Sequence, residues 1–170
     1  MDQKKILEFY SRKDIQKEII DISKDREIAA RFNESFGKRP DILQYESDIL
    51  EIAKQGATSF HCSEELWKNP LHLMPSMSKK DMDSLRKAWD LVIDIDCKYF
   101  EYSKIAANII VKFIKSKGID SVSAKFSGGT GFHIGVPFEA FPSKIQTTKI
   151  IDTKDYFPDG VRIVASYIKE

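Results

Sequence analysis

The sequence predicts an α+β protein, and three observations in its second half support that prediction. Apolar and polar residues alternate near 90–96, which is the pattern of a strand with one buried face. Apolar residues then recur at helical spacing over 101–117. Two further alternating segments, near 121–127 and 132–137, are joined by a glycine-rich turn at 128–131, and glycine supplies the positive φ that tight hairpins need. The predicted order is therefore β-α-β-β.

The predicted helix over 101–117 has an apolar side and a basic side, and Gly118 is its expected stop. The residues expected to face the core are Tyr102, Ile105, Ala106, Ile109, Ile110, Phe113 and Ile114. The basic residues of the outer side are Lys104, Lys112, Lys115 and Lys117. This segment is the clearest helix in the sequence.

We expect one domain over 1–170 with three parts, beginning with an N-terminal helical lobe over 1–89. The helices predicted in this lobe cover residues 2–24 (one or two helices), 47–55 and 78–88. Short extended segments are expected at 26–32 and 58–63, with Ser63 as a candidate N-cap for a helical turn at 64–67. The other two parts are a motif-bearing core over 90–138 and a tail over 139–170 with a terminal helix opened by Pro158.

Composition excludes several classes of protein. Hydrophobic residues make up 42% and charged residues 31% of the 170, which is typical of a globular chain and not of a disordered one. The net charge of +1 gives no global attraction to a polyanion, so any nucleic-acid surface must be a local patch. The two cysteines, Cys62 and Cys97, form no C-x-x-C motif, and no apolar run reaches the roughly 20 residues of a membrane span. We therefore expect a cytoplasmic protein with no membrane partner.

Asp94 and Asp96 are the first candidate site. Two residues apart on a strand, they emerge on the same face, where like charges repel unless a cation lies between them. Hard carboxylate oxygens suit Mg²⁺ or Mn²⁺. The alternative is an ordinary strand end with two solvated aspartates.

A second group of residues joins this pair on the same predicted face. Alternation places Lys125, Ser127 and His133 opposite the core residues of their strands, beside the turn at 128–131. Carboxylates for a metal, and amides, a hydroxyl and an imidazole for phosphate oxygens, are what a metal-bound polyphosphate needs. The combination favours a nucleotide site over a structural role.

The N-terminal half contributes one weaker candidate. Its densest basic cluster comprises Arg26, Arg31, Lys38 and Arg39, which either contact nucleic acid or are solvated loop charges. His61 beside Cys62 has no further ligands near it in sequence, so a packed or hydrogen-bonded histidine is expected there in place of a metal pair.

At two motifs the sequence resembles the archaeo-eukaryotic primase superfamily, in particular the N-terminal portion of the catalytic small subunit of archaeal DNA primase. The motifs are the hydrophobic-D-x-D of Val92–Asp96 and the S-G-x-x-G-x-H of Ser127–His133. Segments 25–27 and 58–61 also look like such subunits. The resemblance implies a primase-type catalytic core with an RRM-like β-α-β-β unit.

The resemblance also implies an activity, template-directed nucleotidyl transfer that makes or extends primers. Asp94 and Asp96 would be the catalytic, metal-holding residues for two Mg²⁺ or Mn²⁺ ions. The triphosphate would be bound by Lys125, Ser127, Gly128, Gly129, Gly131 and His133. The implied partners are nucleoside triphosphates, a DNA template and primer, and a primase large subunit or a complementary C-terminal half, in a DNA-associated intracellular setting.

Three departures from the family leave other functions open. The family has a third aspartate on a later strand, whereas here Asp152 and Asp155 lie in a polar stretch that lacks strand character. The family's zinc-binding insertion is missing, and Thr130 stands where relatives often carry a basic residue. The last helix has no stop signal, so we expect the catalytic domain to be C-terminally incomplete. The alternatives are a non-catalytic nucleotide- or nucleic-acid-binding remnant and a metal-dependent phosphoesterase.

Overall fold

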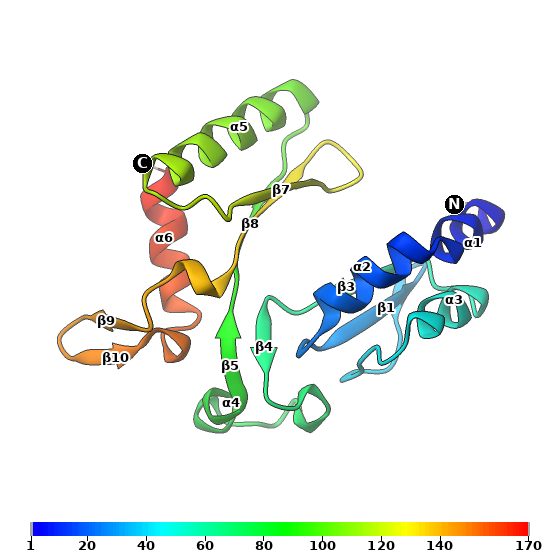
Figure 1. The fold of residues 1–170 in the computed structure, drawn as a ribbon, viewed down its shortest axis with the longest axis horizontal. Coiled ribbons are helices and arrows are strands. Elements are labelled where there is room, and N and C mark those ends of the chain that lie inside the picture. Colours follow the sequence, from blue (N-terminus) through cyan, green and yellow to red (C-terminus); the bar gives the residue numbers. More distant parts are fainter. Residues whose placement is uncertain (1, 170) are drawn as a thin grey trace. The chain divides into compact units, whose positions relative to one another are not determined.

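The computed structural model describes residues 2–169, and the chain divides into two compact units, 1–87 and 88–170 (Figure 1). The boundary lies two residues before the end of the predicted lobe over 1–89. The architecture is mixed, with helices and small antiparallel sheets in both units, as the α+β prediction requires.

The first unit contains helices, as the sequence predicted for this lobe, together with five short strands among the residues described. Its helices are α1 (Gln3–Ser11), α2 (Lys13–Ser23), α3 (Glu46–Lys54), the 3-10 turn η1 (Pro70–His72) and α4 (Lys79–Leu85). Its strands are β1 (Ile28–Phe32), β2 (Ser35–Phe36), β3 (Ser59–Cys62), β4 (Glu65–Trp67) and β5 (Arg86–Trp89), the last of which runs into the second unit. The strands form a β2-β1-β3 sheet and a β4-β5 pair.

Helices cover one face of the β2-β1-β3 sheet. The buried core contains Ile6 and Tyr10 of α1, Ile28 of β1 and Ile49 and Ala53 of α3. Since side chains alternate along a strand, the opposite face carries the residues between those of the core. The residues on this opposite face are Glu27, Ala29, Arg31, Ser59 and His61.

Two local predictions for the first unit are wrong. Residues 65–67 form a strand and not a helical turn, and the Ser63 hydroxyl donates to the Glu65 carbonyl at 2.7 Å. The helix expected to reach residue 88 ends at Leu85, and the chain continues as β5. Both errors have one cause, which is that β4 and β5 pair with each other across some 20 residues, so helical spacing is overridden by a non-local contact.

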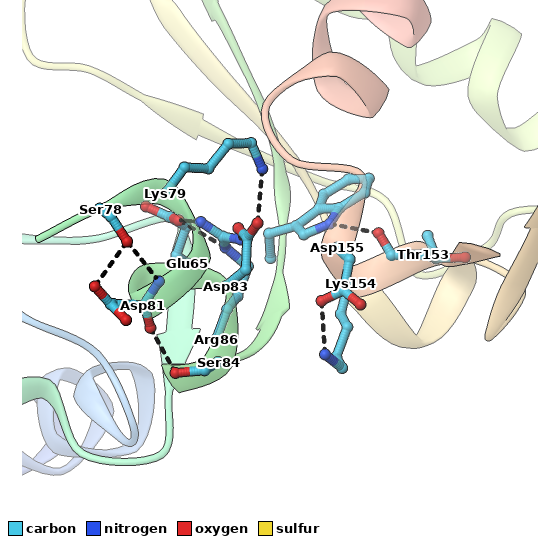
Figure 2. A network of polar contacts seen from close by, with 11 residues as sticks. Glu65, Ser78, Lys79, Asp81, Asp83, Ser84, Arg86, Thr153, Lys154 and Asp155 are labelled. Carbon is cyan, nitrogen blue, oxygen red and sulfur yellow. Dashed lines mark hydrogen bonds and ion pairs between the residues drawn. The ribbon is translucent and has the colours of Figure 1, made fainter.

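A buried ion cluster accompanies this pairing (Figure 2). The Arg86 side chain is only 3% exposed and donates to Glu65 through Nε at 2.8 Å and to Asp83 through Nη1. Burial raises the pKa of Asp83, but hydrogen bonds from Lys79 and Arg86 outweigh that effect and hold the pKa below its usual value. Burial raises the pKa of Glu65 although Arg86 opposes it. The cluster therefore depends on Arg86.

The second unit contains the predicted β-α-β-β order. Its first elements are β6 (Leu91–Ile95), α5 (Phe100–Ser116), β7 (Ser123–Phe126) and β8 (Phe132–Val136). The strands form an antiparallel sheet of order β6-β8-β7, so the first strand pairs with the hairpin as expected. Gly118 has a φ of 84° just beyond α5, which is the helix stop that glycine favours.

Helix α5 covers one face of this sheet with part of the predicted side, since Ile110, Phe113 and Ile114 contact the core, but the helix is rotated from the predicted orientation. The buried residues are Ser103, Ala107 and Ile114, whereas Tyr102, Ile105 and Ile109 are exposed. The apolar stripe of α5 is wider than one face, so the spacing alone did not fix the rotation of the helix. Small side chains at 103 and 107 permit a close approach to the sheet.

The tail packs onto the same core and is not separate from it. It contains η2 (Phe138–Ala140), β9 (Lys144–Gln146), β10 (Ile150–Asp152), η3 (Thr153–Asp155) and α6 (Asp159–Lys169). Trp89, which is 1% exposed, donates from its indole to the Thr153 carbonyl at 3.0 Å and packs against Phe138 and Phe141. The stretch around Asp152 does have strand character, contrary to expectation, because β10 pairs with β9.

Replacing Arg86 by alanine is expected to lower the free energy of unfolding by about 3–5 kcal/mol, because Glu65 and Asp83 lose their shared buried cation. Urea unfolding followed by circular dichroism measures the change. The matched control is Lys54→Ala, which breaks an exposed pair with Glu51 and should change stability by less than about 1 kcal/mol. Equal effects of the two variants would contradict a structural role for the cluster.

Candidate functional site

The open face of the β6-β8-β7 sheet brings together most of the predicted site. Pairing places Asp94 of β6 and Lys125 of β7 on either side of His133 in β8. The Nε2 atom of His133 lies 3.6 Å from Oδ1 of Asp94, and the two side chains are 41% and 69% exposed. An acid, an imidazole and an amine thus form one row across the sheet, on the face away from α5.

Asp96 extends this row beyond the end of β6. It follows Ile95 directly and is exposed like Asp94. Alternation along β6 turns Leu91, Ile93 and Ile95 toward the core, so both aspartates reach solvent on the open face. The acid pair is therefore accessible to a ligand.

The glycine-rich turn forms a closed loop beside the acid pair. The amide of Ser127 donates to the Gly131 carbonyl at 3.1 Å, and Gly128 has a φ of 99°. Within residues 2–169 the amides of Gly128, Gly129 and Thr130 have no acceptor. Several backbone N–H groups on one turn form a concave site for an anion. The loop can thus donate to phosphate oxygens.

Gly131 joins the loop to the acid pair by close packing. It is buried, and a Cβ at this position would lie 2.4 Å from the carbonyl oxygen of Ile95 and 3.0 Å from Oγ of Ser127. Ile95 is the residue between the two aspartates. No other side chain fits there, so glycine at 131 lets the loop lie directly on the backbone of the D-x-D motif.

The donor set suits a hard divalent cation. Mg²⁺ usually keeps several waters and is held by one or two carboxylates together with substrate phosphates, which matches two exposed aspartates beside free amides. Among residues 2–169 no group of three histidines, cysteines or acids is placed to hold a metal by itself. Asp155, which the sequence did not favour as a third ligand, forms an ion pair with Lys154 at 2.6 Å.

The basic cluster of the first unit is only partly available for binding. Arg39 forms a two-point ion pair with the buried Glu27, at 2.6 and 2.8 Å, and this contact raises the pKa of Arg39. Arg26 donates to the carbonyls of residues 22, 63 and 64. Arg26 is therefore used within the fold, whereas Arg39 has two of its three guanidinium nitrogens in the pair with Glu27. Arg31, which among the described residues donates only to the Asn33 carbonyl, and the exposed Lys38 keep donors for a partner.

His61 is hydrogen-bonded, as expected. Its Nε2 lies 3.0 Å from Oγ of Ser59, and its ring packs edge-on against Phe36. What the sequence did not indicate is that His61 and Cys62 line a pocket of the first unit together with Trp67. The only signal of this pocket in the sequence is the aromatic content of the short strands, and ordinary protein cores have the same content.

The contact between loop and acid pair can be tested with two alanine substitutions. Gly131→Ala should weaken metal-dependent nucleotide binding at least tenfold, because the new methyl group would displace the loop from the Ile95 carbonyl. Gly129→Ala is the matched control, since its Cβ meets nothing within 4 Å. Calorimetric titration with a nucleoside triphosphate and Mn²⁺ gives both affinities. Similar losses in both variants would show that loop position is unimportant.

Comparison with known proteins gives little further information. No family model and no solved structure matches the chain. An uncharacterized protein of Methanocaldococcus jannaschii, MJECS07, is 28% identical over 141 residues, which cover 74% of this chain. The chain matches only 30% of that relative's length. The chain is thus similar to one part of a longer archaeal protein.

None of the helices described is long and apolar enough to cross a membrane.

Proposed function

We propose that the second unit binds the triphosphate of a nucleotide and a divalent cation, as part of a DNA-dependent nucleotidyltransferase of the primase or primase-polymerase type. The observation that carries the proposal is the close packing of Gly131 against the Ile95 carbonyl. This packing keeps the donor amides of the loop beside the two exposed carboxylates. The resemblance of both motifs to archaeal primase small subunits supports the same reaction.

The chain's own groups would act by positioning and charge. The amides of 128–130 donate to phosphate oxygens, and Lys125 and His133 lie beside Asp94 in the row across the sheet. Ser127 offers a hydroxyl at the start of the loop. Phosphoryl transfer needs in-line placement and neutralised charge more than covalent chemistry by the protein, which fits this set of groups.

Asp94 and Asp96 would hold Mg²⁺ or Mn²⁺, which supplies Lewis acidity toward the phosphates and activation of the attacking 3′-hydroxyl. Water and phosphate oxygens would complete the coordination, as is usual for Mg²⁺ held by two carboxylates. The partners proposed are a nucleoside triphosphate, a template with its primer, and a large subunit or complementary C-terminal segment.

A second candidate is a non-catalytic nucleotide- or nucleic-acid-binding module. It is favoured by one observation, that no third acid joins Asp94 and Asp96 among residues 2–169. Such a module would bind nucleotide with Mn²⁺ but form no phosphodiester bond. The two candidates therefore differ in product and not in ligand.

Primer synthesis and extension with Mn²⁺ and ribo- or deoxynucleotides tests the enzyme directly. We expect product from the unmodified chain and at least a hundredfold loss when Asp94→Ala and Asp96→Ala are combined, because removing interactions made in the transition state lowers the rate steeply. The control is Asp120→Ala, an exposed aspartate of the same unit outside the row. Nucleotide binding without product would select the binding module. Hydrolysis of a phosphate ester without primer synthesis would select the phosphoesterase. No metal-dependent binding at all would reject both primase-type proposals.

Arg31 and Lys38 are the proposed contacts of the first unit with the phosphate backbone. Replacing both by glutamate should weaken binding to single-stranded DNA. The negative slope of log K against log salt should become shallower by about 1–2, since about 0.7 counterion is released per phosphate contact on a single strand. The control is Lys5→Glu with Lys17→Glu, which makes the same change in net charge on exposed helical positions. Equal salt slopes for the two double variants would show that Arg31 and Lys38 are ordinary solvated charges and do not contact the DNA. Fluorescence anisotropy at several salt concentrations supplies the data.

A further inference from the structure

The first unit contains a pocket that the proposed nucleotidyl-transfer site does not use. Its volume is about 520 Å³, within the roughly 300–1,000 Å³ of small-molecule sites. All its lining residues belong to the first unit, from the open side of the β2-β1-β3 sheet, from β4 and from residues 73–82. The pocket is thus built by one compact unit alone.

The charged groups of the pocket are already matched. Glu27 is held by Arg39 through two hydrogen bonds, and Glu65 is held by the buried Arg86. Arg39 uses Nε and Nη2 for this pair, so its Nη1 keeps two donors, on a side chain that is 58% exposed. A neutral lining with one outward donor group suits an uncharged polar ring better than a phosphate or a metal ion.

The walls are aromatic and thioether groups. Phe36 is 49% exposed and is kept edge-on to the His61 ring, with centroids 5.2 Å apart, while Met74 and Met82 line the other side. Exposed aromatic faces are costly in water unless a flat partner covers them, and bases stack on such faces in single-strand binding proteins. The ring of Phe36 is therefore available for stacking.

Trp67 provides an independent sign of a missing partner. It lines the pocket and is 3% exposed, yet its indole N–H has no acceptor among the residues described. Its ring is fixed from behind by Arg86, whose guanidinium lies 5.4 Å from the ring centroid. A buried donor without an acceptor destabilises a protein, and an acceptor atom of a ligand that reached the indole would remove that cost.

We infer that this pocket binds a single unpaired nucleobase, stacked on Phe36 and accepting hydrogen bonds from Arg39. The base comes either from a single-stranded nucleic acid that crosses the first unit or from a free mononucleotide. Both sources offer the same planar ring with acceptor atoms. Because the pocket needs neither Asp94 nor Asp96, the inference stands or falls separately from catalysis in the second unit.

Protection of Cys62 tests the pocket without a substitution in its lining. Cys62 lines it and is exposed, so a bound base should slow alkylation by iodoacetamide at least threefold, whereas Cys97 in the second unit supplies the internal reference rate. The assay uses EDTA and the full chain with Asp94→Ala and Asp96→Ala, to exclude binding at the acid pair. The probes are a dT12 oligonucleotide and, separately, AMP. Protection by dT12 alone identifies a strand, and protection by AMP identifies a free nucleotide.

A matched pair of aromatic variants gives the second measurement. Phe36→Ala should raise the Kd of the protecting probe about 5- to 100-fold, which corresponds to one lost stacking contact. Phe9→Ala is the control, since Phe9 is similarly exposed, at 46%, in the same unit but outside the pocket. Circular dichroism confirms that both variants fold. Unchanged Cys62 alkylation with both probes, or equal Kd values for the two variants, would overturn the inference.

Discussion

The antiparallel pairing of β6 with β8 is the contact on which the second unit depends. It sets Asp94 opposite His133, and through β8 it also sets Lys125 on the other side of that histidine. A slip of one residue would turn Leu91, Ile93 and Ile95 to solvent and the aspartates into the core. Burial of Ile134 and Val136 against α5 excludes such a slip, so the apolar face fixes the position of the polar one.

The sequence predicted this unit well because its elements follow local periodicities. The alternation near residues 91–95 and 132–136 and the turn at 128–131 each need only neighbouring residues to be recognised. The same alternation placed Lys125 and His133 with Asp94 correctly. The rotation of α5 was missed, since the exposed Ile105 and Ile109 are more apolar than the buried Ser103 and Ala107.

The first unit was predicted less well because non-local contacts decide it. The sequence pattern of β5 predicts the end of a helix. In the structure these residues form a strand, in which Arg86 forms ion pairs with Glu65 of β4 and with Asp83. Spacing does not reveal which arginines bond groups of the fold: Arg26 donates to backbone carbonyls, and Arg39 shares two hydrogen bonds with the Glu27 carboxylate. The pocket beside Trp67 could not be predicted from the sequence, because its walls come from segments that are separate along the chain.

The order β6-β8-β7 leaves β6 and β7 as the edge strands of their sheet within the residues described. Edge strands invite another chain to add itself, and natural proteins discourage this with charges on the edge. Asp94 and Lys125 stand on those two edges, so the residues proposed for nucleotide binding also protect the folded chain from association. A hydrophobic replacement at either position would therefore remove a charge from an edge strand as well as a group of the proposed site.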